Sequence, residues 1–405
     1  LFSPWILALC FLVVIAIFQI RTTPDLANHQ PPMPLRWKVF WSALFTVFLG
    51  HSFLHGVLFH PHDWDSLMYH LPLIDQWIQT GTLSATNIAR SHDSANSELL
   101  GFWFAFAFSG DFFVACNNLP ILIVWVAAVI NLSRLLGVKD SWSNAAAMAS
   151  IAIDISIRQT IDASNDLMVV AFFLSGLCYA IRYQKSSSRS DLVLFGLCLG
   201  LLAGVKYFAV AYALLLGVLF AGYTCRSYGL RRMFVDSITA ICISLPTGIY
   251  WYARNYLITG YPLYPAGSDD IQKRIMHPEM SQTTLLFNRS EEIAELAILA
   301  VWNQAGVLHL TLTLCFPLML AILGYLTLRQ RTSSEAPREF VSLLFLSLLG
   351  TFAITLVTPM LVEDKAQHAQ SSTVGRHTGT LCAMFFDFTL YRGRLPATEM
   401  VSYHI

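Results

Sequence analysis

Long apolar runs separated by short polar stretches dominate the chain and predict a bundle of membrane-crossing helices. A helix needs about 20 apolar residues to cross the hydrocarbon core of a bilayer, because its backbone amides must be hydrogen-bonded within the segment. We expect crossings near 4–20, 38–60, 112–137, 142–162, 165–183, 192–205, 207–225, 234–253, 306–328 and 340–361. The pattern therefore predicts an all-α, polytopic transmembrane bundle of about 10 crossings, which form a single domain over residues 1–405.

Two further apolar pieces are too short to cross a membrane. Residues 99–109 read LLGFWFAFAFS, and we expect a helix that is only partly inserted at the interface. Residues 378–390 are short and irregular, and we assign no element to them. Because the chain begins at Leu1 inside an apolar run, we expect it to be truncated at one or both ends.

The polar stretch 61–98 is the first long loop, and it begins with an amphipathic helix. Its apolar positions recur at helical spacing and are Leu67, Leu71, Ile74, Trp77 and Ile78. Such a helix lies in the interface, and Gly81 is a plausible stop for it. Asp65 lies near the start, where it can cap the helix, and Tyr69 lies one turn further on the same face.

Composition agrees with the membrane class and narrows the function. Of the 405 residues, 55% are hydrophobic and only 12% are charged, against about 25% charged in soluble domains. The formal net charge is zero, so bulk charge gives no argument for nucleic-acid binding. The chain has no P-loop, no GxSxG, no HExxH and no dinucleotide-binding fingerprint. The cysteines form no CxxC pair and lie mostly in apolar runs, where they are typical of small buried hydrophobes.

The distribution of lysine and arginine predicts the orientation. One alternate set of loops is short and basic, so we expect it to face the cytoplasm. This set holds Arg21, Arg36, Lys38, Arg134, Lys139, Arg182, Lys185, Arg189, Arg226, Arg231, Arg232, Arg329, Arg331 and Arg338. The opposite loops include 61–98 and a second long region, 254–305, which we assign to the outer face of the cytoplasmic membrane, towards the periplasm or the exterior.

Charged residues of the outer set gather at helix ends. A charge at membrane depth costs about 2.5–3.5 kcal/mol on insertion scales, so it needs a water-filled cavity or a partner. We therefore expect one polar cavity on the outer face. The residues that would frame it are Asp65, Glu98, Asp162, Asp166, Lys206, Arg254 and Arg376.

Asp65 is the first candidate for chemistry, because a carboxylate at the mouth of an apolar cavity can act as a general base. The alternative is a simple helix cap, which would contribute about 1 kcal/mol. The cluster His60, His62, Asp63, Asp65 and His70 also supplies ligands suited to a divalent metal, with His62 and Asp63 as candidates. Its Asp-x-Asp pattern matches one that binds metal and nucleotide-sugar in soluble glycosyltransferases.

Asp166, Lys206 and Arg254 complete the candidate set. Asp166 opens an inward-running helix, where a carboxylate is favourable for the helix dipole alone, but its place on the outer face makes it a catalytic candidate. Cations such as Lys206 and Arg254 can hold a phosphate or pyrophosphate headgroup. The alternative for each cation is that its side chain extends to the interface without binding a ligand.

Four segments, taken in order, resemble the bacterial membrane glycosyltransferases of family 39. They read WDSLMYHLPLIDQWIQTGTL, SNDLMVVAFFL, GVKYFA and RNYLITGYPLYP, and the resemblance covers about residues 38–265. This group is related to protein O-mannosyltransferases and aminoarabinose transferases and has the GT-C fold. The first segment is the most specific of the four.

The resemblance implies roles for individual residues. Asp65 matches the base in the first outer loop, with the aromatic Tyr69 four positions on, and Asp166 matches a second acid. The substrate-binding residues that it implies are Tyr69, His70, Glu98, Lys206, Arg254 and Asn255. Family members often have a Pro-Pro pair near Glu98, and this chain has Ser-Ala-Asn-Ser at 94–97 instead.

The implied reaction is the transfer of a sugar from a polyprenyl-phosphate donor to a glycan, lipid or protein acceptor on the outer face. Asp65 would deprotonate or orient the acceptor, and Lys206 and Arg254 would stabilise the leaving phosphate as the anomeric centre inverts. A nucleotide-binding domain is not expected for such a donor. Two alternatives stay open: a transporter or lipid flippase, and a non-catalytic scaffold that keeps the fold.

Overall fold

The computed structural model describes most of the chain between residues 33 and 264. The described residues are 33–59, 61, 63, 65–84, 91–108, 111–152, 154–264, 282–284, 346–347, 349 and 359–361. The helical elements are α2 (Leu35–Leu58), η1 (Ser66–His70), α3 (Leu71–Thr80), α4 (Asn96–Phe108), η2 (Asp111–Cys116), α5 (Asn118–Leu135), α6 (Asp140–Ile151), α7 (Asp154–Thr160), α8 (Asp166–Ser186), α9 (Arg189–Ala203), α10 (Ala209–Tyr228) and α11 (Leu230–Thr259). Two short strands, β1 (Gln282–Thr284) and β2 (Pro359–Leu361), pair antiparallel.

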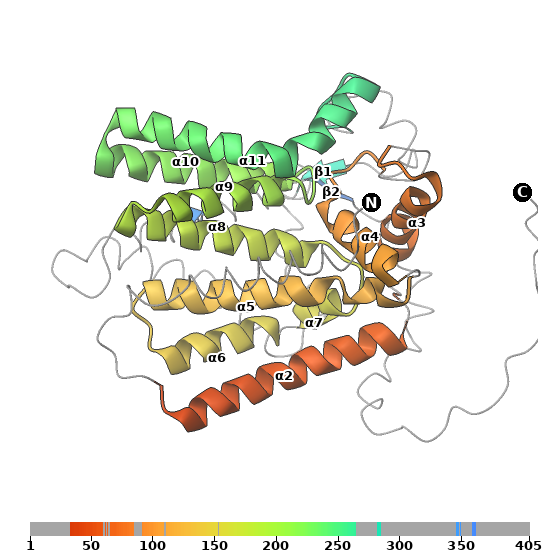
Figure 1. The fold of residues 1–405 in the computed structure, drawn as a ribbon, viewed down its shortest axis with the longest axis horizontal. Helices are drawn as coiled ribbons and strands as arrows, with labels where there is room; N and C mark the ends of the chain where they lie inside the picture. The colour runs from red at the N-terminus through yellow and green to blue at the C-terminus, as the bar shows by residue number, and fades with distance from the viewer. Residues whose placement is uncertain are drawn as a thin grey trace, which may run out of the picture.

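The long helices lie side by side in a stack, with α2 at one edge and α10 and α11 at the other (Figure 1). Short turns join α5 to α6, α8 to α9 and α10 to α11, so consecutive passes along the stack run in opposite directions. The turns that connect consecutive helices therefore alternate between the two ends of the stack. The elements α3 and α4 lie together at the right-hand end in Figure 1, which we call the outer-loop end. The other end is called the basic end.

Five stretches of the described chain are long and apolar enough to cross a membrane. They are Leu35–Leu58, Phe112–Leu135, Asp166–Ser186, Ala209–Tyr228 and Leu230–Thr259. Their positions agree with the crossings expected near 38–60, 112–137, 165–183, 207–225 and 234–253. The protein is thus helical, with helices typical of a membrane protein.

One expected crossing differs in the structure. The stretch 142–162 is not one helix, because α6 ends at Ile151 and the short α7 begins at Asp154. The expected crossing 112–137 begins with the 3-10 turn η2 and continues as α5, and the two together make the membrane-length stretch Phe112–Leu135. The stretch 192–205 is helical as α9, whose 15 residues are fewer than the roughly 20 that a membrane crossing needs. The crossings near 4–20 and 306–328 and the piece 378–390 lie outside the described residues, as does nearly all of 340–361.

The largest apolar core lies where α8, α9 and α10 meet, and α5 closes one side of it. Phe195 of α9 and Phe220 of α10 stack in its centre with ring centroids 4.4 Å apart, and both side chains are fully buried. A second core joins α5 and α6 to the first half of α8 around Leu122, Ile151 and Ala171. These two cores make α8 the best-covered long helix of the described chain.

Small residues allow α9 and α11 to approach each other closely. A Cβ atom on Gly196 would lie 2.8 Å from the carbonyl oxygen of Ala240, and one on Gly248 would lie 2.8 Å from the carbonyl oxygen of Gly200. A Cβ on Gly200 would collide with the carbonyl of Ser244. Small residues four apart on both helices are a typical interface between membrane helices.

The expected interfacial helix is present as η1 and α3. Gly81 ends it in the left-handed conformation, with φ of 65°, which confirms the predicted stop. Leu73 and Trp77 are buried, whereas Leu67 is 54% exposed. The π-type turn η1 adds one residue to the first turn, so the buried face is shifted from the one that regular helical spacing predicts. The expected helix at 99–109 is present as α4.

Candidate functional site

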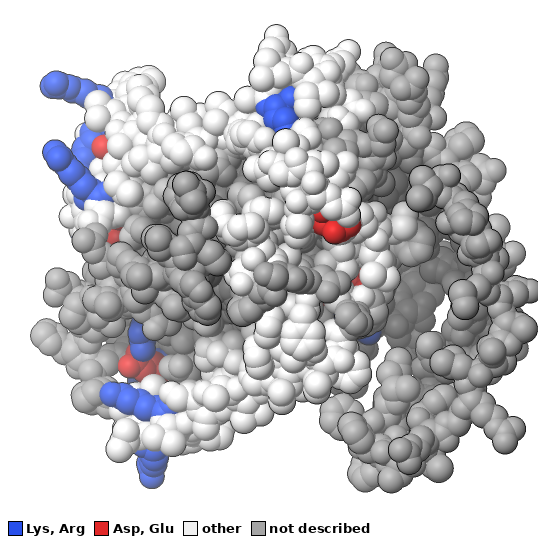
Figure 2. Space-filling model, turned by 45° about the vertical axis from the view of Figure 1, so that its right-hand side comes forward, with Lys and Arg blue, Asp and Glu red and all other residues white. Residues whose placement is uncertain are grey.

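The ionisable residues singled out from the sequence come together at the outer-loop end. Because the passes alternate in direction, the first turns of η1, α4 and α8, the α9–α10 turn and the last turns of α11 all lie there (Figure 1). These positions carry Asp65, Glu98, Asp166, Lys206, Arg254 and Asn255. At the opposite end, the Lys and Arg side chains line the left-hand edge of the surface in Figure 2. For the residues that the structure describes, the two predicted loop sets therefore lie at opposite ends of the stack.

Asp65 does not cap the helix that follows it. Its backbone is already helical, with φ of −63° and ψ of −39°, and its carboxylate makes no capping hydrogen bond. Instead Asp65 Oδ2 accepts a hydrogen bond from the hydroxyl of Tyr69 at 2.9 Å. The prediction that the two side chains share a face is confirmed, while the capping interpretation is wrong. The carboxylate is held by a side chain one turn along the helix and is only half-buried.

Asp63 brings a second carboxylate to the same place. Its backbone N–H donates to Asp162 Oδ2 at 2.9 Å, so the chain before η1 is fixed to the α7–α8 turn. Burial raises the pKa of Asp63, and the nearby carboxylates of Asp162 and Asp65 raise it further. The other metal candidate, His62, lies outside the described residues. Within the part of the chain that is described, no group of three or more His, Cys, Asp or Glu side chains could hold a metal.

Asp162 is buried by a turn that wraps around Asn118. The side-chain amide of Asn118 donates to the carbonyl oxygens of Gln159, Asp162 and Ser164 at 2.7, 3.0 and 2.7 Å. These bonds anchor the turn between α7 and α8 to the start of α5 and leave Asp162 only 4% exposed. The sequence placed Asp162 among the outer charges without a role. Asn118 was missed, because a single asparagine at the start of an apolar run carries no motif.

His70 and Glu98 form a buried pair that joins η1 to α4. His70 Nδ1 lies 2.5 Å from Glu98 Oε1, and the two side chains are 1% and 4% exposed. The second carboxylate oxygen, Oε2, accepts a hydrogen bond from the hydroxyl of Ser97 at 3.0 Å. Both oxygens of this carboxylate therefore have protein partners.

Asp166 and Lys206 form an ion pair between the start of α8 and the α9–α10 turn. Lys206 Nζ lies 2.5 Å from Asp166 Oδ1, and the side-chain amide of Gln159 donates to Asp166 Oδ2 at 3.2 Å. The Asp166 side chain is 54% exposed, whereas that of Lys206 is 14% exposed. The ammonium group also lies 5.5 Å from the centre of the Phe208 ring. This pair places one cation and one accessible acid at the outer-loop end.

Arg254 holds the first outer loop. Its guanidinium donates to the carbonyl oxygens of Leu83 and Asp93 at 3.4 and 3.3 Å and lies 4.9 Å from the Trp251 ring centre. The side-chain amide of Asn255 donates to the carbonyl of His92 at 2.6 Å. Both residues are buried, and Arg254 also donates to the side-chain oxygen of Asn255 at 3.0 Å, so the two side chains hold the loop backbone together. The neighbouring His92 has a pKa below its usual range because of burial and the charge of Arg254.

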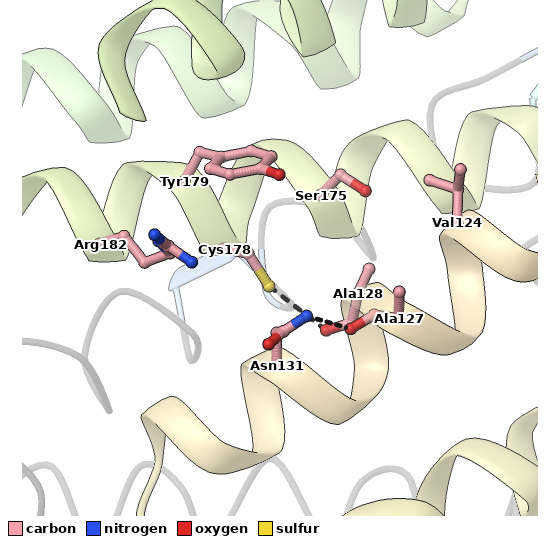
Figure 3. A pocket seen from close by; sticks show the side chains of 8 residues that line it. All are labelled: Val124, Ala127, Ala128, Asn131, Ser175, Cys178, Tyr179 and Arg182. Atoms are coloured by element: carbon pink, nitrogen blue, oxygen red, sulfur yellow. Dashed lines mark hydrogen bonds between the residues drawn. The ribbon is translucent and has the colours of Figure 1, made fainter. Parts of the chain in front are cut away.

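A cavity that the structure does describe lies away from these residues. It has a volume of about 20 Å³, room for about one water molecule, and lies between α5 and α8 (Figure 3). Asn131, Cys178 and Arg182 are among the side chains that line it. Of the predicted frame of an outer cavity, Arg376 lies outside the described residues. The other six residues lie at one end of the stack, where they belong to separate contacts between different elements.

Comparison with known proteins gives one match. The model of a family described as a domain of unknown function (DUF8201) matches residues 96–361, about two thirds of the chain. The matched region contains the acid of α4, the α7–α8 turn, the ion pair and the end of α11, while Asp65, Tyr69 and His70 precede it. No curated protein and no solved structure matches the chain.

Proposed function

The chain belongs to the DUF8201 family, and from its outer-loop end we propose that it is a membrane glycosyltransferase that uses a polyprenyl-phosphate-linked sugar. The sugar is transferred to an acceptor on the outer face of the cytoplasmic membrane. The observation that carries the proposal is the presence of a tyrosine-held carboxylate, Asp65, and a lysine, Lys206, at the same end of the membrane-length helices.

A lipid-linked donor requires this kind of arrangement. Its polyprenyl chain stays in the bilayer, so the phosphate and sugar stand at the level of the helix ends. A cation there offsets the charge of the phosphate, and an acid activates the acceptor. The orientation that we infer from the basic end, which faces the cytoplasm, puts these residues on the outer side.

Asp65 acts as the general base. It takes the proton of the acceptor hydroxyl as the acceptor oxygen attacks the anomeric carbon, and the bond from that carbon to the phosphate oxygen breaks with inversion. The hydroxyl of Tyr69 orients the Asp65 carboxylate through the 2.9 Å hydrogen bond. The electron pair of the broken bond leaves with the polyprenyl phosphate.

Lys206 binds the phosphate and stabilises the charge that develops on it. In the free protein Asp166 neutralises Lys206 at 2.5 Å, and because Asp166 is the more exposed partner, it is displaced when the phosphate enters. Arg254 has a different role from Lys206. Its guanidinium is already held by two loop carbonyls, so it fixes the loop and acts on the phosphate only at longer range.

The described helices favour this reaction over transport. In the five membrane-length stretches, the Asp, Glu, Lys and Arg residues lie within about two turns of a helix end. A substrate path through a bundle is usually marked by ionisable residues near the middle of the membrane.

The test is a transfer assay in native membranes with a panel of synthetic polyprenyl-phosphate hexoses and pentoses. Asp65→Asn should lower turnover by at least about 100-fold, because general base catalysis contributes that much or more. Asp75→Asn is the matched control, since Asp75 is an exposed acid of the adjoining α3 whose described contact is Gln79. Turnover by Asp65→Asn equal to that of the control, at equal expression, would refute the role of Asp65.

A further inference from the structure

The buried pair of His70 and Glu98 calls for an explanation beyond stability. A carboxylate removed from water loses several kcal/mol of hydration, and its attraction to a partner rarely gives back more than that. Two apolar side chains of similar volume would hold η1 and α4 together equally well. The pair is 1% and 4% exposed, so a phosphate or sugar would have to displace well-packed side chains to reach it.

The pair lies at the end of a short series of contacts that leads to the candidate base. His70 follows Tyr69, and the two rings have their centroids 4.1 Å apart. Tyr69 in turn donates its hydroxyl to Asp65. The contacts therefore run from Glu98, in the first turn of α4, through His70 and Tyr69 of η1 to Asp65, which directly precedes η1. The π-type turn between them is a form often found at functional sites and depends on its surroundings for stability.

The other end of the series is fixed to the helix stack. Asn96, two residues before Glu98, donates its side-chain amide to the carbonyls of Leu201 and Thr247 at 3.1 and 3.0 Å. Its Oδ1 accepts a hydrogen bond from the indole of Trp251 at 2.8 Å. The first turn of α4 is thus held by α9 and α11. The contact of Glu98 with His70 then connects this fixed turn to η1.

We propose that His70 and Glu98 are positioning residues, which hold the Tyr69–Asp65 hydrogen bond in place and do not contact the substrate. The effect of this positioning on catalysis rests on the proposed function. The geometry of the Tyr69–Asp65 hydrogen bond can be tested without measuring turnover. The pair fixes the end of η1 while the Asp65–Tyr69 bond spans its start. Loss of the pair should therefore loosen that bond and leave Lys206 unaffected, because Lys206 is held by other elements.

The first measurement uses 3-fluorotyrosine placed at position 69 of the full chain and read by fluorine NMR in nanodiscs. Glu98→Gln, which keeps the shape and removes the charge, and His70→Gln should each move the resonance towards its position in Asp65→Asn. The double variant should move it no further than the larger single shift, because both changes break one contact. Asp75→Asn is the control and should leave it in place.

A resonance that stays at the wild-type position in both single variants would overturn the proposal. If Glu98→Gln does not fold, Ser97→Ala serves in its place, because it removes the hydrogen bond to Glu98 Oε2 and keeps the pair. It should give a smaller shift in the same direction, and no shift would count against the proposal.

The second measurement separates positioning from substrate contact. With an active polyprenyl-phosphate sugar, Glu98→Gln should lower kcat by about 10- to 100-fold while KM for the donor stays within about twofold. A raised KM with unchanged kcat would mean that the pair binds the donor, which overturns the inference and leaves the transferase proposal intact. If wild type transfers no sugar from the panel, the transferase proposal fails, whereas the fluorine shifts still decide whether the pair positions Tyr69.

Discussion

The ion pairs at the two ends of the helix stack differ in how far apart their partners lie in the sequence. At the basic end, Arg134 pairs with Asp140, Arg182 with Asp191 and Arg232 with Asp236, over separations of 6, 9 and 4 residues. At the outer-loop end, His70 pairs with Glu98 over 28 residues and Lys206 with Asp166 over 40. The long-range contacts described at the basic end join a charged group to a neutral one, such as Tyr183 with Asp236, or two neutral groups, such as Gln184 with Thr224.

The difference shows which end depends on the assembled fold. A pair between neighbours in sequence forms within one helix or where a helix turns back, and it mainly balances the local charges. A pair across 28 or 40 residues exists only after several helices have packed, so its geometry is set by the whole stack. A site that needs fixed distances between an acid and a cation is better built from the second kind of contact.

The largest effect should come from Asn96, which fixes α4 to the stack. Asn96→Ala leaves the carbonyls of Leu201 and Thr247 and the indole of Trp251 without that partner, so we expect about 3 kcal/mol of lost stability. The matched change at the basic end, Arg134→Ala, breaks a half-exposed ion pair and should cost about 0.5 kcal/mol or less. Denaturation in mixed micelles, followed by tryptophan fluorescence, measures both. If Asn96→Ala and Arg134→Ala lost the same free energy of unfolding, the contacts of the two ends would not differ in their contribution to stability.

Binding of a phosphate should distinguish Lys206 from the lysines of the basic end. Lys206→Met removes a charge-assisted contact, so we expect farnesyl phosphate to bind about tenfold more weakly. Asp166→Asn should tighten binding, because it removes the group that competes for Lys206. Phosphorus NMR titration in nanodiscs gives the affinities, with Lys139→Met as the exposed control at the other end. Unchanged affinity in Lys206→Met would contradict the phosphate role.

The sequence predicted the described crossings well because their signal is local. A run such as 165–183 needs only its own apolar residues to be recognised, and the alternation of basic loops then assigns Lys206 and Asp166 to one end. The break between α6 and α7 was missed because hydropathy stays high across it. The hydrogen bonds from Asn118 to the α7–α8 turn could not be predicted from the sequence either, because they join residues 41 to 46 positions apart.

The same reason limits what the sequence could say about the site. The Asp65–Tyr69 bond follows from helical spacing and was predicted as a shared face, whereas the pairing of His70 with Glu98 depends on how α4 returns to η1. Arg254 is a third case. A buried arginine at a helix end is compatible with a phosphate site and with a loop anchor, and the structure adds its hydrogen bonds to the carbonyls of Leu83 and Asp93, which the sequence did not indicate.

Acidity should loosen the outer-loop end before the basic end, through His92. The pKa of His92 is lowered by burial and by Arg254, so the folded protein holds it neutral. Its contribution to stability is present above the ordinary histidine pKa of 6.5 and is lost as the pH falls towards the lowered folded value. Hydrogen exchange of the segment 91–95 should rise between pH 7 and pH 5, and His92→Gln should flatten this dependence. A profile that is unchanged in the variant would exclude His92 as its cause.

The smallest effect should come from Asp63, where the fold opposes a charge. Burial and the carboxylates of Asp162 and Asp65 raise its pKa, so the unfolded chain loses the proton at a lower pH than the folded protein. Stability therefore declines as the pH rises from the ordinary aspartate value of 3.8 to the raised folded value and stays lower above it. Asp63→Asn keeps the backbone N–H that donates to Asp162 and removes this decline, so the variant should be slightly more stable than wild type at pH 7. Thermal unfolding at pH 4 and pH 7 measures the difference, with Asp75→Asn as an exposed control. A variant that is less stable than wild type at pH 7 would show that the backbone N–H of Asp65 and the nearby His70 stabilise the Asp63 carboxylate more than burial and its acidic neighbours oppose it, and the outer-loop end would then hold its acids as the basic end does.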